Sequence, residues 1–257
     1  MLFNSITFIL FFTIILVVHY SGLNWKLKKS NLLLGSYIFY AAWNPPFVLL
    51  LFLSTFVDWN IATKIHHANS NTKRKRWLCL SLLFNLGLLV VFKYSGFLLD
   101  NFQSLTRLMG WDFVSIDPGF ILPMGISFYT FQTLSYTLDI YFKKIKPHDS
   151  FLDYALFVSF FPQLVAGPIV RAKDFLPQLK QQNRIGFDTF SQGMSLFIIG
   201  IFLKTVLADA FFAPIVNSVF IDGVQADGLS TWLAAVFFYA QIFCDFAGSS
   251  LCAIGTA

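Results

Sequence analysis

Apolar runs alternate with short polar segments along the whole chain, and their lengths are typical of membrane helices. A spanning helix needs about 20 apolar residues, within a range of roughly 17–25. The runs that reach or approach this length are Leu2–Tyr20, Leu32–Trp43, Phe47–Ile61, Leu78–Phe92, Phe120–Phe142, Phe187–Phe212 and Thr231–Phe246. The pattern predicts an all-α, polytopic membrane protein with about seven transmembrane helices. We expect residues 1–257 to form a single transmembrane domain, without a soluble domain.

Prolines mark two of the predicted helix boundaries. The tandem prolines of Asn44-Pro45-Pro46 cannot lie inside a helix without breaking it, so we expect two short or tilted spans joined by a tight turn. One kinked helix is the alternative. Pro123 lies near the start of the Phe120–Phe142 run, where a helix tolerates proline.

Lysine and arginine concentrate in alternate connections between the runs. The basic segments are Ser21–Ser30, Lys64–Trp77, Lys143–Ser150 and Ala172–Gly186, and the neutral or acidic ones are Asn44–Pro46, Lys93–Gly119 and Ala213–Ser230. Basic loops remain on the cytoplasmic side of a membrane. We therefore expect the N-terminus outside and the C-terminus inside.

Phe151–Val170 breaks this alternation, because it lies between two basic segments. We expect it to enter and leave the membrane by the same face, as a re-entrant element. Irregular backbone at membrane depth is tolerated only where protein or a water-filled cavity satisfies it. The residues expected to break this element, or to supply polar groups near it, are Pro162, Gly167, Pro168, Gln163 and Arg171. The alternative is an interfacial amphipathic helix over Phe151–Phe161, followed by an ordinary cytoplasmic loop.

Composition supports the membrane assignment. Of the 257 residues, 56% are hydrophobic and only 12% are charged, about half the charged fraction of soluble domains. The net charge of +5 reflects the cytoplasmic loops, so no nucleic-acid partner is expected. The first run lacks a basic n-region and a small-residue cleavage site, so we expect a retained helix. Cys79, Cys244 and Cys252 are scattered in apolar runs, which predicts neither a disulfide framework nor a metal site.

Polar residues inside the runs are candidates for function, because they are costly in a membrane. Gln132, Ser135, Tyr136 and Asp139 follow i, i+3, i+4, i+7 spacing and share one helix face. That face should point at protein or a cavity. Interhelical hydrogen bonding and a functional role both remain open for it.

Two later runs carry further polar residues. Lys204 and Asp209 are five residues apart, a spacing that does not stack in an α-helix, so we expect Lys204 to snorkel or to pair with another helix. Gln241 and Asp245 are four residues apart and share one face of the last run. No histidine lies at mid-membrane on a polar face. The catalytic motifs of hydrolases, metalloproteases and nucleotide-binding enzymes are absent from the sequence, so these residues alone fit both transporters and enzymes.

Several long stretches resemble the membrane-bound O-acyltransferase (MBOAT) family, in its bacterial alginate O-acetyltransferase-like branch. They are KRWLCLSLLFNLGLLVVFKYSGF (Lys75–Phe97), LPMGISFYTFQTLSYTLDIYF (Leu122–Phe142), FFPQLVAGPIVRAKDFLPQL (Phe160–Leu179), GIFLKTVLAD (Gly200–Asp209) and YAQIFCDFAG (Tyr239–Gly248). The resemblance covers essentially the whole chain. It implies a ring of tilted helices around a thinned centre, in the bacterial inner membrane, with a tunnel across it.

The resemblance also implies a reaction. An acyl group would pass from a cytoplasmic thioester, acetyl-CoA or similar, through the tunnel to a hydroxyl of an exported polysaccharide such as alginate, and no cofactor would stay bound. A periplasmic acetyltransferase of the same polysaccharide-modification system is an expected partner. The residues expected to line the tunnel or substrate path are Gln132, Tyr136, Asp139, Gln163, Gly167, Pro168, Arg171, Gln241 and Asp245.

The sequence departs from the family pattern near its end. The family uses a tunnel histidine as its base, and that region lies beyond Ala257, so no catalytic residue is assigned here. DFAGSSLCAIGTA also replaces the family's DFSGYSDMAIG, with Leu251 and Cys252 in place of polar positions. We expect this chain to be inactive alone, as a fragment, a truncated product or half of a split enzyme completed by a second chain. A transporter or flippase of envelope precursors and a non-catalytic scaffold are the alternatives.

Overall fold

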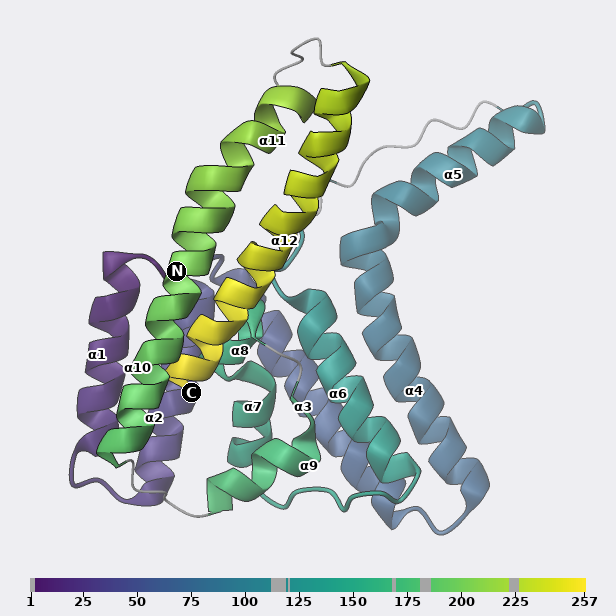
Figure 1. The fold of residues 1–257 in the computed structure, drawn as a ribbon. Helices are drawn as coiled ribbons and strands as arrows, with labels where there is room; N and C mark the ends of the chain where they lie inside the picture. Colours follow the sequence, from purple (N-terminus) through teal and green to yellow (C-terminus); the bar gives the residue numbers. More distant parts are fainter. Residues whose placement is uncertain (1–2, 112–118, 120, 168–169, 181–185, 222–226) are drawn as a thin grey trace. The chain divides into compact units, whose positions relative to one another are not determined.

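The computed structural model describes residues 3–111, 119, 121–167, 170–180, 186–221 and 227–257 (Figure 1). Within these ranges the ordered elements are all helices, with no strand. This confirms the predicted all-α class. The chain groups into two compact units: the first unit comprises Met1–Phe39, Phe160–Ile169 and Lys180–Ala257, and the second unit comprises Tyr40–Ser159 and Val170–Leu179.

In the part of the chain that the structure describes, the first unit contains five α-helices, most of α2 and one π-helical segment. They are α1 (Ile6–Tyr20), α2 (Trp25–Ala41), α8 (Phe161–Ala166), α10 (Phe187–Ile201), η3 (Phe202–Phe212), α11 (Ala213–Phe220) and α12 (Gly228–Thr256). The helices of the second unit are α3 (Pro46–His67), α4 (Asn71–Leu89), η1 (Val90–Tyr94), α5 (Ser95–Leu108), α6 (Ile126–Tyr141), α7 (Phe151–Ser159), α9 (Ala172–Phe175) and most of the 3₁₀ segment η2 (Leu176–Lys180).

Four continuous helices in the described ranges are long and apolar enough to cross a membrane. They are Pro46–His67, Asn71–Leu108, Phe187–Phe220 and Gly228–Thr256. Ile6–Tyr20 and Phe151–Leu164 are shorter apolar helices. The chain is therefore a multi-pass membrane protein. The expected total of about seven transmembrane helices stays a prediction.

Helix boundaries differ from the sequence expectation where charged residues were taken for loops. The Leu78–Phe92 run lies inside a 38-residue helix, Asn71–Leu108. It begins early because Ser70 Oγ accepts the backbone N–H of Lys73 as an N-cap, and lysine and arginine are good helix formers. It continues through the π-helical segment η1, so the first part of the predicted loop Lys93–Gly119 is helical.

Two other boundaries involve proline. α2 ends at Ala41 and α3 begins at Pro46, so the predicted pair of helices is correct and the single kinked helix is not. By contrast, α6 begins only at Ile126, after Gly125 with φ 71°. The helix predicted from Phe120 is therefore too long, because Pro123 precedes the helix instead of lying in its first turn.

Aromatic packing holds α1, α2 and α8 together in the first unit. Phe8, Phe39 and Phe161 are buried in one cluster, with the rings of Phe8 and Phe39 6.1 Å apart and those of Phe39 and Phe161 5.6 Å apart. Ser36 Oγ accepts the backbone N–H of Phe161 at 3.1 Å, which satisfies a donor at the start of α8. Of the 33 phenylalanines in the chain, these three therefore serve helix packing.

Glycines let α10 and α12 approach until their backbones touch (Figure 1). A Cβ on Gly200 would lie 2.6 Å from the carbonyl oxygen of Gly248, and one on Gly255 would lie 2.5 Å from that of Gly193. The two glycines on each helix are one heptad apart and meet their partners in antiparallel order. Small residues are the usual means of close helix packing in membranes, where apolar burial gives little driving force.

We predict that Gly200→Ala destabilises the α10–α12 pair, because the new methyl group must displace backbone atoms of the other helix. Overpacking of this kind costs about 1–3 kcal/mol. Unfolding of the purified protein in mixed micelles measures the change. Gly87→Ala is the matched control, since Gly87 lies in a spanning helix with no atom within 4 Å of its added Cβ; equal losses from both variants would contradict the prediction.

A buried polar cluster joins α3, α4 and α6 in the second unit. Asp58 is fully buried, and its carboxylate accepts hydrogen bonds from Ser81 Oγ at 2.9 Å and Asn85 Nδ2 at 2.8 Å. Thr133 on α6 donates to Asn85 Oδ1 at 3.3 Å. Each helix thus supplies a polar side chain whose burial would cost free energy without hydrogen-bond partners from the other helices.

We expect Asp58→Ala to lower the free energy of unfolding by about 1–3 kcal/mol, because Ser81 and Asn85 lose their buried acceptor. Asp100→Ala removes an exposed carboxylate from α5 and should change stability by less than about 0.5 kcal/mol. The same unfolding assay compares the two variants. A loss no greater for Asp58→Ala than for Asp100→Ala would show that the cluster does not hold these helices together.

Candidate functional site

The polar face predicted on α6 is directed largely at α7 within the second unit. Gln132 is buried, and its Nε2 donates to the carbonyl oxygen of Phe157 at 2.7 Å. The buried ring of Tyr136 lies 4.6 Å from that of Tyr154. Hydrogen bonding and aromatic packing between helices therefore occupy these two candidates. Asp139, at the end of α6, lies 3.7 Å from Lys144 Nζ.

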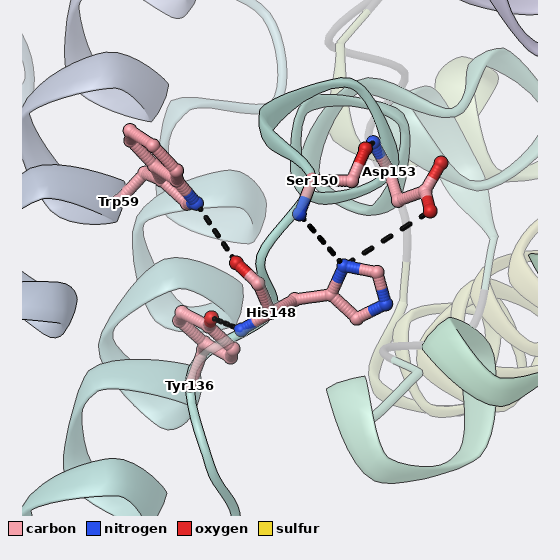
Figure 2. A network of polar contacts seen from close by, with 5 residues as sticks. All are labelled: Trp59, Tyr136, His148, Ser150 and Asp153. Atoms are coloured by element: carbon pink, nitrogen blue, oxygen red, sulfur yellow. Dashed lines mark hydrogen bonds and ion pairs between the residues drawn. The ribbon is translucent and has the colours of Figure 1, made fainter. Parts of the chain in front are cut away.

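A network around His148 connects α3, α6 and the start of α7 (Figure 2). The indole N–H of Trp59 donates to the His148 carbonyl oxygen at 3.1 Å, and the His148 backbone N–H donates to the Tyr136 hydroxyl oxygen at 2.9 Å. The backbone N–H of Ser150 points at His148 Nδ1 at 3.4 Å, and Asp153 Oδ2 lies 4.0 Å from the same nitrogen. The network fixes the segment that leads from α6 into α7.

Ser150, His148 and Asp153 lie together, but they are not arranged for nucleophilic catalysis. Ser150 Oγ accepts the backbone N–H of Asp153 at 3.3 Å, as a helix N-cap does. His148 Nδ1 meets the backbone of Ser150 and not its hydroxyl group (Figure 2), whereas activation of serine needs a base on the hydroxyl. The sequence placed His148 only within the basic segment Lys143–Ser150, although the Ser-x-x-Asp spacing was a cue to the cap.

The element predicted to be re-entrant divides into α7 and α8. Residues Asp153–Ser159 of α7 are all buried within the protein, so both the re-entrant element and the interfacial helix stay predictions. α8 begins at Phe161 with Pro162 in its first turn, so the helix is interrupted at Phe160, before this proline.

The remaining candidates of this element have different surroundings. Gln163 is buried, and the backbone N–H of Gly167 donates to its carbonyl oxygen at 3.1 Å, which ends α8. Arg171 is exposed and precedes α9. Pro168 lies outside the described residues. Whether the element is re-entrant stays a prediction.

An ionic cluster joins η3 and α12 in the first unit. Lys204 Nζ lies 2.9 Å from Asp209 Oδ1 and 2.6 Å from Asp245 Oδ1. The expectation that residues five apart would not pair was wrong, because the segment is π-helical, with i→i+5 hydrogen bonds that bring positions 204 and 209 onto one face. The expected pairing of Lys204 with another helix is correct. Gln241 lies one turn before Asp245, and its buried Oε1 accepts no hydrogen bond from a described residue.

Lys204→Met should destabilise the protein, because it leaves two carboxylates close together on helices that span the membrane. We expect a loss of about 1–3 kcal/mol in the free energy of unfolding. Adding Asp209→Asn and Asp245→Asn to Lys204→Met should recover most of that loss, since no unpaired charge remains. If the triple variant is no more stable than Lys204→Met, charge pairing is not the cause.

Outside the spans, Asp227 caps the N-terminus of α12. Its Oδ1 accepts the backbone N–H of Ser230 at 2.8 Å. Hydrogen bonds from Ser230 lower the pKa of Asp227 below its ordinary value, because they favour the ionised carboxylate. The charge also complements the positive end of the helix.

Comparison with known proteins gives the class to which the chain belongs. Residues 143–257 match the MBOAT, membrane-bound O-acyltransferase family, and carry a domain of that family. The chain is 35% identical to the peptidoglycan O-acetyltransferase of Helicobacter pylori over 88% of its length. It is 34% identical to the probable alginate O-acetylase AlgI of Pseudomonas syringae and of Pseudomonas aeruginosa, in each case over 99% of its length.

The chain spans about half the length of these relatives. The shares covered are 47% of the Helicobacter pylori protein, 49% of the Pseudomonas syringae protein and 48% of the Pseudomonas aeruginosa protein. The similarity extends through both compact units. The resemblance drawn from the sequence motifs is thereby confirmed.

Proposed function

We propose that this chain supplies one half of a membrane O-acyltransferase that modifies an exported polysaccharide. The observation that carries the proposal is similarity over nearly the whole chain to proteins named as peptidoglycan O-acetyltransferase and probable alginate O-acetylase. These names share an acetyl group and a glycan acceptor. The proposed substrate class is therefore a sugar hydroxyl, with alginate and peptidoglycan as examples.

The chemistry requires a general base, because an alcohol is a weak nucleophile at neutral pH. We do not assign this role to His148: the contacts of its Nδ1 with the backbone of Ser150 and the side chain of Asp153 orient the ring, but nothing in the described residues places a substrate hydroxyl beside it. By resemblance to the family, the base is a histidine in the region that follows the part matched by this chain. We therefore propose that the 257 residues act together with a second polypeptide segment and are inactive alone.

The acyl donor and the membrane location are also proposed from the resemblance to the family. The basic segments support a cytoplasmic face, where a thioester such as acetyl-CoA is the proposed donor. The acyl group would cross a tunnel in the bacterial inner membrane, with the N-terminus of the chain outside. A periplasmic acetyltransferase is the proposed receiving partner, and the candidates Gln132, Tyr136, Asp139, Gln163, Gly167, Pro168, Arg171, Gln241 and Asp245 remain the proposed tunnel lining.

We expect the chain alone to transfer no acetyl group, and co-expression with the second half of the Helicobacter pylori relative to restore transfer. Membranes from cells without their own polysaccharide acetylase would receive labelled acetyl-CoA, and label on the polysaccharide would be counted. The Helicobacter pylori protein itself, divided at the equivalent position, is the control that shows whether two halves assemble.

Each alternative gives a different result in this assay. Transfer by the 257 residues alone would refute the proposed inactivity. Uptake of an envelope precursor without covalent change would identify a transporter. If the divided control is active and the mixed pair is not, although both chains reach the membrane, the chain is not an acyltransferase half of this type.

A further inference from the structure

Basic side chains from two segments far apart in the sequence surround one hollow in the second unit. The hollow has a volume of about 410 Å³ and lies between the α3–α4 connection, the start of α4 and the segment after α6. Among the described residues, its lining includes Arg74, Lys143, Lys146 and His66, and no carboxylate. The volume falls in the usual range of ligand pockets, roughly 300–1,000 Å³. An excess of positive charge in a concave site attracts anions.

Arg74 is held in position at this hollow. Its guanidinium group donates to the carbonyl oxygen of Tyr141 at the end of α6, and lies 5.2 Å from the centre of the Tyr141 ring. One guanidinium has five N–H donors, so these contacts orient the group and leave donors for a ligand. Arginine presented in this way matches two oxygens of a phosphate group.

Helix α4 adds backbone donors at the same place. Ser70 and Asn71, at its first turn, line the hollow. Ser70 Oγ accepts the N–H of Lys73, while the other amides of the first turn have no acceptor within the helix. A 19-residue helix directs the positive end of its dipole to this point.

Lys143 occupies a position that normally holds glycine. Its φ is 60°, and it is the one non-glycine residue with positive φ among the described residues. The Lys143 N–H donates to the Ile140 carbonyl oxygen at 3.0 Å and the Lys144 N–H to that of Asp139 at 2.8 Å, the hydrogen bonds of a Schellman motif. Lysine is strained in this conformation, and such strain concentrates at functional sites.

We propose that this hollow binds a phosphate group. Arg74 and the first turn of α4 provide donors from one side of the sequence and Lys143 and Lys146 from the segment after α6, and no carboxylate is among the described lining residues. The loop charges predict that this face is cytoplasmic. Two sources carry the required group there: the headgroup of an anionic lipid, and a soluble phosphorylated molecule. This inference rests on the lining of the cavity and does not depend on the proposed acyltransferase function.

Binding can be measured on the full chain in nanodiscs of phosphatidylcholine, which has no net charge. Coenzyme A and inorganic pyrophosphate are the soluble probes, titrated by calorimetry at low and high salt. For the lipid source, phosphatidylglycerol is added to the discs and the lipid retained on the protein is measured by native mass spectrometry.

Matched variants separate the hollow from general surface charge. Lys146→Gln removes a lining cation, and Lys144→Gln makes the same change two residues away, outside the lining. Lys143→Gly removes another lining cation and places the residue that the left-handed conformation favours. It should therefore weaken binding without lowering the melting temperature, which excludes misfolding as the cause.

A soluble ligand is indicated if coenzyme A and pyrophosphate bind, weaken about tenfold in Lys146→Gln and Lys143→Gly, and weaken further in salt. A lipid ligand is indicated if only phosphatidylglycerol is retained and both variants lose it. The proposal is overturned if Lys144→Gln weakens binding as much as Lys146→Gln, or if neither the probes nor phosphatidylglycerol bind the unaltered chain.

Discussion

The absence of water from the bilayer interior is the constraint on which this structure depends. A polar group there must find its partner within the protein. Asp58 meets Ser81 and Asn85 from α4, Gln132 meets the backbone of α7, and Lys204 meets Asp245 from α12. In soluble proteins hydrophobic burial selects the helix faces that pack together. Here these polar contacts contribute to that selection.

The hydropathy pattern predicted the class of the fold and the separation of α2 from α3, because apolar length and tandem proline act locally. It misplaced the starts of α4 and α6. A run of lysine and arginine marks a membrane boundary, but it does not end a helix, so α4 begins at Asn71, well before its apolar part. Pro123 has the opposite effect, since α6 starts only after it.

The candidate site was predicted less well, because its partners depend on packing. The shared face of Gln132 and Tyr136 followed from spacing, but not their contacts with α7. Lys204 and Asp209 form a pair that α-helical spacing forbids, because the chain is π-helical there. Asp58 was overlooked, although a single carboxylate in an apolar run is a strong sign of a buried polar partner.

The glycine contacts between α10 and α12 have a consequence for how this helix pair is aligned. Gly193 contacts Gly255 and Gly200 contacts Gly248. These two contacts together fix the alignment of the two helices along their axes. Sliding one helix by a heptad, about 10 Å at 1.5 Å per residue, keeps at most one of the two contacts. The alignment is thus determined within the pair, and it does not depend on the length of the segment that connects the helices.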